Sequence, residues 1–116
     1  MKKFNKFIIQ KDKLIFDAIN LISINKNRAV FVLDKTKIIG IVSEGDIIKA
    51  LSQNKKINTP LINIMTKSFK FVMKNNRNLA LKYFKNDPIS VLPVVNKNMK
   101  IIDVITLKEI LNRIEH

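Results

Sequence analysis

The sequence predicts an α/β (α+β) fold made of two similar repeats, because the same pattern of apolar runs occurs twice in 116 residues. Short runs rich in Val and Ile lie at 29–33 and 38–42, separated by a four-residue polar loop, which is typical of a β-hairpin. Apolar residues then recur three and four positions apart, at Ile47, Ile48 and Leu51, as on one face of a helix. A hairpin and a helix therefore follow one another in this part of the chain.

The repetition is clearest at the junction between the second hairpin strand and the helix. Ser43 corresponds to Thr106 and Asp46 corresponds to Glu109, in both cases 63 positions later. Upstream of the hairpin loop the offset becomes 62, because the second loop is one residue longer. An internal repeat in so short a chain implies two equal lobes related by a pseudo-twofold axis.

The remaining elements follow from local patterns. A helix over about 13–25 carries two adjacent apolar stripes, a broad face suited to packing on a sheet. In the last helix Ile110, Leu111 and Ile114 recur at helical spacing, as on one apolar face. A polar linker at 53–59 leads to Pro60, which suits the start of a short helical turn. The other predicted elements are strands at 7–10, 69–72, 91–95 and 101–105 and a helix that ends before Pro88.

The segment Ser43–Asp46 is the candidate functional junction. The free N–H groups of a helix's first turn can bind an anion, and the Ser43 hydroxyl would lie beside them. Asp46 can accept hydrogen bonds from a pair of hydroxyls, and Lys49 adds a positive charge one turn later. The alternative is structural, since Ser-x-x-Asp is close to a capping box that satisfies the helix's own amides. Recurrence of the pattern at the second junction favours the ligand interpretation.

Composition excludes several classes of function. The chain has no cysteine, one histidine (His116, the last residue) and two glycines, which argues against thiolate chemistry, paired-histidine metal sites and a phosphate-binding glycine loop. No histidine is available to activate Ser43, so we do not expect an enzyme. The net charge of +13 comes mostly from lysines dispersed between Lys2 and Lys108, so nucleic-acid binding stays a minor alternative. No apolar run approaches the roughly 20 residues that span a bilayer, and we expect a cytoplasmic protein.

The segment Gly40–Ile47 reads Gly-Ile-Val-Ser-Glu-Gly-Asp-Ile and resembles the Gly-hydrophobic-x-Ser/Thr-x-x-Asp signature of CBS domains. Leu92–Val95 and Asn63–Thr66 are similar to further phrases of that family. The chain thus resembles a tandem CBS-domain pair, a single module over 1–116 with repeat one at about 5–53 and repeat two at about 61–115. The resemblance implies repeats of strand-helix-strand-strand-helix, packed through their sheets. The Ser-x-Gly-Asp-Ile phrase more narrowly resembles CBS pairs found beside sugar-phosphate nucleotidyltransferases.

The resemblance implies a regulatory module that binds an adenosine-containing nucleotide in the cleft between repeats and controls an attached or partner enzyme. AMP, ADP, ATP or S-adenosylmethionine is the expected ligand, with no required cofactor. In the family the Ser/Thr usually contacts phosphate and the Asp contacts ribose. The candidate ligand-binding residues are Ile9, Arg28, Val30, Ser43, Asp46, Lys49, Val91, Thr106 and Glu109.

Departures from the family pattern weaken the second site. In the second repeat Asp103 takes the place of Gly40, and Glu109 has one methylene more than an aspartate; the first repeat departs only in having Phe31 at the place of Pro93. We therefore expect the second junction to be mainly structural. A purely structural dimerisation or docking module remains the alternative function. The helices carry more apolar surface than one sheet can cover, which predicts a homodimer, and the final helix lacks a stop signal, which suggests a place within or beside a larger enzyme.

Overall fold

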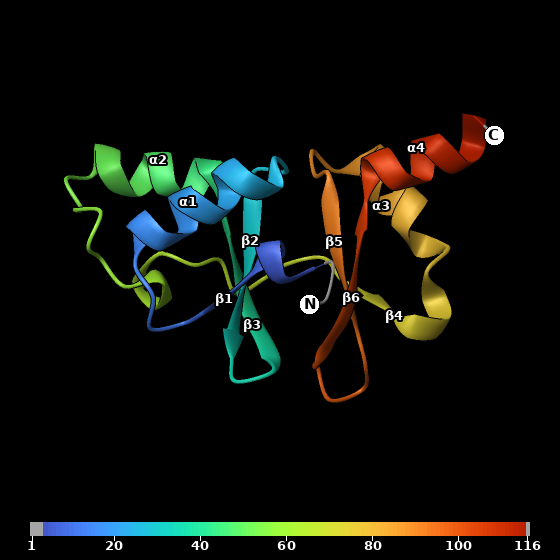
Figure 1. Ribbon diagram of the computed structural model, residues 1–116, viewed down its shortest axis with the longest axis horizontal. Helices are drawn as coiled ribbons and strands as arrows, with labels where there is room; N and C mark the ends of the chain where they lie inside the picture. The colour runs from blue at the N-terminus through green and yellow to red at the C-terminus, as the bar shows by residue number, and fades with distance from the viewer. Residues whose placement is uncertain (1–3, 116) are drawn as a thin grey trace. The chain divides into compact units, whose positions relative to one another are not determined.

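The computed structural model describes residues 4–115, with the side chains of 114 and 115 left out, so His116 lies outside the described residues. The chain divides into two compact units, Met1–Phe69 and Lys70–His116, which we call the first and second units. Each contains a three-stranded sheet with helices, which confirms the mixed α/β fold (Figure 1). No helix within 4–115 is long and apolar enough to cross a membrane.

The two units repeat the same order of elements. In the first unit these are β1 (Ile8–Gln10), α1 (Ile15–Asn25), β2 (Ala29–Asp34), β3 (Lys37–Ser43) and α2 (Glu44–Ser52). In the second they are β4 (Val72–Met73), α3 (Leu79–Asn86), β5 (Val91–Val95), β6 (Ile101–Thr106) and α4 (Leu107–Glu115). Single 3₁₀ turns lie at η1 (Asn5–Phe7), η2 (Leu61–Asn63) and η3 (Lys74–Asn76).

The sheets share their topology down to an irregularity in the hairpin. In each unit the first strand pairs in parallel with the second, and the second pairs antiparallel with the third. The register shifts between Val32 and Leu33 in one hairpin and between Val94 and Val95 in the other. Because these positions are 62 residues apart, the bulge belongs to the repeated unit and was kept in both copies.

The core of the first unit joins α1 and α2 to the sheet. Its helical members are Ile15, Ala18, Ile22, Ile47 and Ala50, and Leu61 of η2 closes one side. The broad apolar face expected for α1 is narrower than predicted, since Ile19 is exposed. The first hairpin loop is also shorter than predicted, because both strands extend into the polar segment and leave only Lys35 and Thr36 between them.

The predicted buried face of α2 is partly wrong. Ile47 is buried as expected, but Ile48 and Leu51 are 66% and 39% exposed, and Ala50 takes their place in the core. The physical reason is that the end of β3 fixes where α2 begins and so fixes its rotation toward the sheet. Apolar spacing identifies two adjacent stripes on such a helix but does not say which one faces inward. The same correction applies to Leu111 of α4, which is exposed.

The second unit buries a smaller core, made of Val72, Ala80, Phe84, Leu92, Val94 and Ile105. The strand predicted at 69–72 is displaced, because β4 comprises only Val72 and Met73. These residues are the ones that pair with Val94 and Val95 at the end of β5. Pairing with the end of β5, and not the apolar run before it, therefore determines where β4 lies.

Candidate functional site

The junction between β3 and α2 forms the capping box that was one of the two interpretations of Ser43–Asp46. Asp46 N–H donates to Ser43 Oγ at 3.1 Å, and Ser43 N–H donates to Asp46 Oδ2 at 2.9 Å. The Ser43 hydroxyl also donates to the same carboxylate oxygen at 3.0 Å. Both side chains therefore stabilise the start of α2 and are half-buried at one point on the unit's surface.

A third side chain reaches this junction from residues 64–69, which follow η2 and which we call the linker from here on. Ile41 and Thr66 exchange two backbone hydrogen bonds of 2.9 and 2.8 Å, so the segment after η2 lies beside β3. The Thr66 hydroxyl then donates to Asp46 Oδ1 at 3.2 Å. Each carboxylate oxygen of Asp46 thus accepts at least one hydrogen bond. Sequence reasoning missed Thr66, because 20 residues separate it from Asp46 and no periodicity links them.

Gly40 was the one sequence signal that could have revealed this close approach. An ideal Cβ at Gly40 would lie 2.8 Å from Met65 Sδ and 3.1 Å from the Thr66 carbonyl oxygen. Both distances are shorter than ordinary van der Waals contact, so a side chain at this position would force Met65 and the Thr66 backbone to move. The glycine of the sequence motif therefore favours the close approach of the segment that carries Thr66.

The other candidates of the first unit divide into surface and core residues. Arg28 is exposed, adopts a φ of 65° and accepts a hydrogen bond from Glu44 N–H through its carbonyl oxygen at 2.9 Å. Lys49 is exposed on α2, one turn after Asp46. Ile9 and Val30 are buried in the hydrophobic core, so their side chains do not line the surface near Asp46.

The second junction repeats the cap but not its surroundings. Glu109 N–H donates to Thr106 Oγ1 at 3.2 Å, as Asp46 does to Ser43 in the first unit. Leu107 N–H donates to the Ser90 carbonyl oxygen at 2.8 Å, the counterpart of the Glu44–Arg28 bond. Thr106 is buried and pairs with the buried Val91, so both lie in the packed end of the hairpin.

Asp103 gives the second unit a different chemistry at the place of Gly40. Its carboxylate accepts from Arg77 Nη2 at 3.0 Å and from the Val104 N–H at 2.8 Å. Among the described residues, no isolated bridge forms along β6 as Thr66 forms one along β3. A charged side chain thus occupies the position that the linker approaches closely in the first unit.

A CBS domain family model matches residues 2–53 and again residues 62–116. The chain therefore belongs to the CBS domain family and carries a tandem pair of these domains. A curated relative, an uncharacterized 17.7 kDa protein from Acidianus ambivalens, is 26% identical over 106 residues. That match covers 90% of this chain and 64% of the relative, so the chain spans less than two thirds of that protein's length.

Solved structures of CBS pairs have the same fold. The CBS domain pair of protein MJ0100, in complex with 5′-methylthioadenosine and S-adenosyl-L-methionine, is 25% identical with a TM-score of 0.74. The match covers 94% of this chain and 87% of that one. The CBS domain protein PAE2072 from Pyrobaculum aerophilum, complexed with AMP, is 19% identical with a TM-score of 0.73 and coverages of 88% and 80%. Proteins of this family are generally regulatory rather than catalytic.

Proposed function

We propose that this chain is a regulatory module that binds an adenosine-containing nucleotide at the Ser43–Asp46 junction and transmits its occupancy to an attached or partner enzyme. The observation that carries the proposal is the half-buried Asp46 carboxylate, held between the Ser43 and Thr66 hydroxyls at the start of α2. The similar CBS pair of MJ0100 holds two adenosine compounds, which supports this ligand class. AMP, ADP, ATP and S-adenosylmethionine are the candidates.

The hydrogen bonds at the junction suggest how a nucleotide would bind. A ribose offers two neighbouring hydroxyls, and these would donate to the Asp46 carboxylate in place of Thr66, whose bond of 3.2 Å is the longest of the set. The Ser43 hydroxyl and the exposed Arg28 guanidinium would then contact phosphate, with Lys49 adding charge nearby.

The linker offers a route by which the effect of ligand binding would be transmitted from the site. Thr66 is joined to β3 by its backbone and to Asp46 by its side chain, so displacement of the Thr66 hydroxyl changes one of the contacts that fix this segment. A ligand shifts an equilibrium only through contacts that differ between the two states. Replacement of the Thr66–Asp46 hydrogen bond by ribose–Asp46 hydrogen bonds is such a difference, and we propose that it transmits ligand binding to the linker.

Calorimetric titration of Asp46→Asn and Glu109→Gln with the four candidate ligands tests the proposal. In Asp46→Asn the new amide would still accept from Ser43 N–H and would donate to Thr66 Oγ1, so we expect stability to fall by about 1 kcal/mol or less. Ribose binding loses charge-assisted hydrogen bonds of roughly 1.5–3 kcal/mol each, so affinity should drop about tenfold to hundredfold or more. Glu109→Gln serves as the matched change in the second unit and should leave affinity nearly unchanged.

Two results would contradict this function. If the unaltered chain binds none of the four ligands, the nucleotide proposal fails. If Asp46→Asn binds as tightly as the unaltered chain, Asp46 is only a helix cap and the structural docking module becomes the better interpretation.

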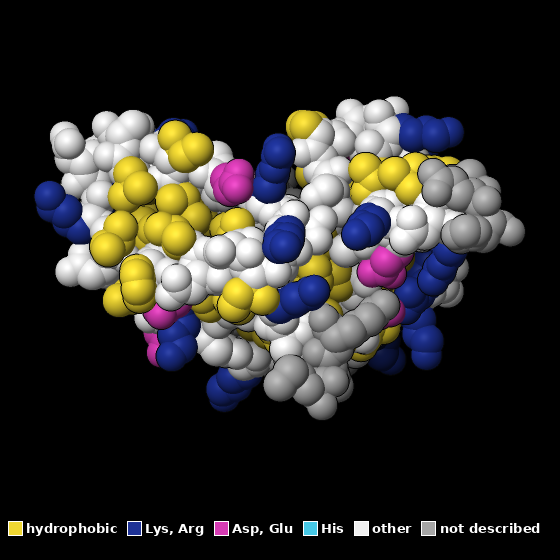
Figure 2. Space-filling view, turned by 45° about the horizontal axis from the view of Figure 1, so that its top comes forward, with side chains coloured by type: hydrophobic (Ala, Val, Ile, Leu, Met, Phe, Trp, Pro, Cys, Tyr) yellow, Lys and Arg dark blue, Asp and Glu magenta, His cyan; other side chains and the backbone are white. Residues whose placement is uncertain are grey.

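We propose that the module works as a homodimer, because apolar side chains remain exposed on the helices of the first unit. Hydrophobic side chains gather over this part of the surface in Figure 2. They are contributed by Phe16, Ile19 and Ile24 of α1 and by Ile48 and Leu51 of α2. Twofold symmetry is the commonest way to cover such a patch, and we assign it to a second copy of the chain.

Sedimentation of Ile48→Ser tests the dimer. The variant should shift the chain toward monomer, because Ile48 is the most exposed of these apolar side chains. Ile62→Ser is the matched control, since Ile62 is an exposed isoleucine of η2, outside these helices. A monomeric unaltered chain, or equal weakening by both variants, would contradict the assignment.

We propose that the chain acts in the cytoplasm, with a sugar-phosphate nucleotidyltransferase as the first candidate for the enzyme that it controls. Support for this candidate comes only from the Ser-x-Gly-Asp-Ile phrase at Ser43–Ile47 and the Leu-Pro-Val-Val phrase at Leu92–Val95. Activity of that enzyme, measured with this chain in the presence and absence of AMP, should depend on the nucleotide. If AMP changes the enzyme's activity as much with the Asp46→Asn variant as with the unaltered chain, control does not pass through this site.

A further inference from the structure

The hairpin end of the second unit contains an open pocket of about 640 Å³. Its walls come from the end of β4, from η3 and from the loop between β5 and β6, and include Met73, Lys74, Val95, Asn96 and Lys97. A volume of this size is within the usual range for small-molecule sites, roughly 300–1,000 Å³.

This pocket belongs to the second unit, whereas the Ser43–Asp46 junction that we assign to the nucleotide belongs to the first, and it is also separate from the second unit's own strand-to-helix junction. Within β5, Val95 pairs near the hairpin turn with Ile101, whereas Val91 pairs with Thr106 at the opposite end. The pocket therefore lies at one end of the hairpin and the capped start of α4 lies at the other. Whatever binds in it would not compete for the residues of the strand-to-helix junction.

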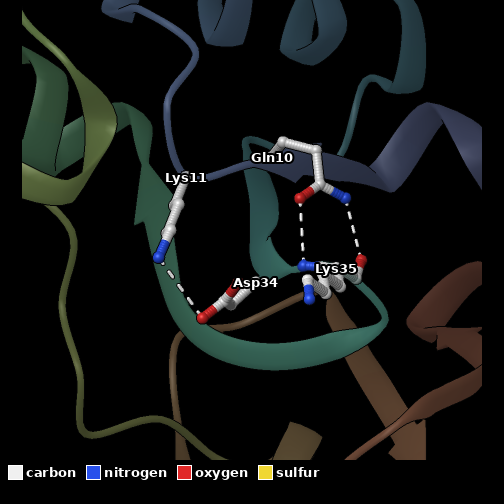
Figure 3. Close-up of polar contacts among 4 residues, drawn as sticks. All are labelled: Gln10, Lys11, Asp34 and Lys35. Atoms are coloured by element: carbon white, nitrogen blue, oxygen red, sulfur yellow. Dashed lines mark hydrogen bonds and ion pairs between the residues drawn. The ribbon is translucent and has the colours of Figure 1, made fainter.

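The first unit has a set of polar contacts at the equivalent place, which we call the clasp and which Figure 3 shows. The Gln10 side chain donates to the Lys35 carbonyl oxygen at 2.8 Å and accepts from the Lys35 N–H at 3.1 Å. Lys11 Nζ lies 3.3 Å from Asp34 Oδ2. These contacts tie the end of β1 to the turn of the first hairpin.

The second unit has lost this clasp but kept its positive charges. Gln10 pairs with Leu33 and Met73 pairs with Val95, so the two strand ends occupy the same register. The four clasp positions Gln10, Lys11, Asp34 and Lys35 are therefore occupied in the second unit by Met73, Lys74, Asn96 and Lys97. The amide and the carboxylate that made the contacts are replaced, whereas both lysines remain.

Asn96 does not take over the role of Asp34. Its side-chain oxygen accepts from the N–H groups of Asn98 and Lys100, at 2.9 and 3.1 Å, and so shapes its own loop. None of the described residues that line the pocket is acidic. Lys74 and Lys97 therefore face the pocket without a carboxylate in it to balance their charge.

We propose that this pocket binds a small organic anion, a molecule with one carboxylate on a compact apolar body. The half-buried Met73 gives its wall an apolar character, and a methionine adapts easily to the shape of a ligand. Lys74 and Lys97 supply two cations at the rim, which suit the anionic group. A neutral apolar molecule would make only the apolar contact, and a small inorganic anion would make only the electrostatic contact with the lysines.

Titration of the full chain with hexanoate, followed by amide ¹H–¹⁵N spectra, tests the pocket. We expect hexanoate to shift the amides of Met73 and of residues 95–98 in a saturable way, and acetate and hexanol to shift them much less. In Lys74→Gln/Lys97→Gln, hexanoate affinity should fall about tenfold, the expected size for losing two partly exposed charge contacts. Lys35→Gln/Lys37→Gln, which removes exposed lysines from the first hairpin, is the matched control and should leave affinity unchanged.

Rebuilding the clasp provides a second and opposite test. Met73→Gln/Asn96→Asp would restore the first unit's side chains, and the aspartate keeps the acceptor that Asn98 and Lys100 need. Hexanoate binding should then be lost while the fold persists. Shifts spread equally over both hairpins, equal binding of hexanol, or unchanged binding in the rebuilt variant would each overturn the proposal. None of these results depends on whether Asp46 binds a nucleotide.

Discussion

Gly40→Ala should destabilise the first unit, and the structure sets the size of the effect. The added Cβ would meet Met65 Sδ at 2.8 Å, Met65 Cγ at 3.0 Å and the Thr66 carbonyl oxygen at 3.1 Å. Part of the Met65 side chain can move, but the carbonyl oxygen belongs to backbone that is hydrogen-bonded to Ile41 on β3. Overpacking of this kind costs about 1–3 kcal/mol. We expect a loss of unfolding free energy within that range.

Gly45→Ala is the matched control on the neighbouring helix. A Cβ at Gly45 would meet only Ser43 Oγ, at an ordinary contact distance of 3.6 Å. Both substitutions remove the same conformational freedom from the unfolded chain, so this contribution cancels when the two variants are compared. Alanine in a helix is favoured over glycine by up to about 1 kcal/mol. Gly45→Ala should therefore be neutral or stabilising.

Urea denaturation of the two variants and the unaltered chain measures the difference. The midpoint of Gly40→Ala should fall and that of Gly45→Ala should stay or rise, with similar slopes. Combining Gly40→Ala with Met65→Ala should recover part of the loss, because residues in contact are not additive. Equal midpoints for the two glycine variants would refute the claim that the close approach of the linker favours Gly40.

Two further predictions concern polar contacts. Asn25→Ala should lower the free energy of unfolding, measured by urea denaturation, by about 1–3 kcal/mol. The buried Asn25 amide donates to the carbonyl oxygens of Lys6 and Ala29, both at 3.0 Å, and its removal would leave a buried carbonyl oxygen without this donor. A loss well below this range would mean that water replaces the amide. Arg77→Gln should cost about 1 kcal/mol or less and still less at high salt, because the Arg77–Asp103 pair is partly exposed; a larger loss that is independent of salt would contradict this.

The two CBS domains share their hairpin and helix-cap geometry but differ in the contacts made at two positions. The hairpin bulges and the caps of the last helices are the same in both, since each follows from backbone geometry within one repeat. The position of Gly40 and that of the Gln10 clasp have diverged. The two copies therefore differ in their contacts at these two places.

Local chemistry let the sequence predict much of this molecule. The paired hairpins, the 63-residue offset and the fold class follow from apolar spacing and turns, which involve residues close together in the chain. The capping box at Ser43 and Asp46 is equally local, because its partners are three residues apart. Its role in ligand binding stays a prediction, since all the observed bonds are made within the protein.

Tertiary structure decided what depends on residues far apart in the sequence. Only the path of the linker brings Thr66 to Asp46, and only the register of β4 against β5 limits that strand to Val72–Met73. The rotation of α2 likewise left Ile48 on the surface, because packing against the sheet chose between two stripes of similar hydrophobicity. Hydrophobic periodicity specifies that a face is buried, whereas the contacts of the folded chain determine which face and against which partner.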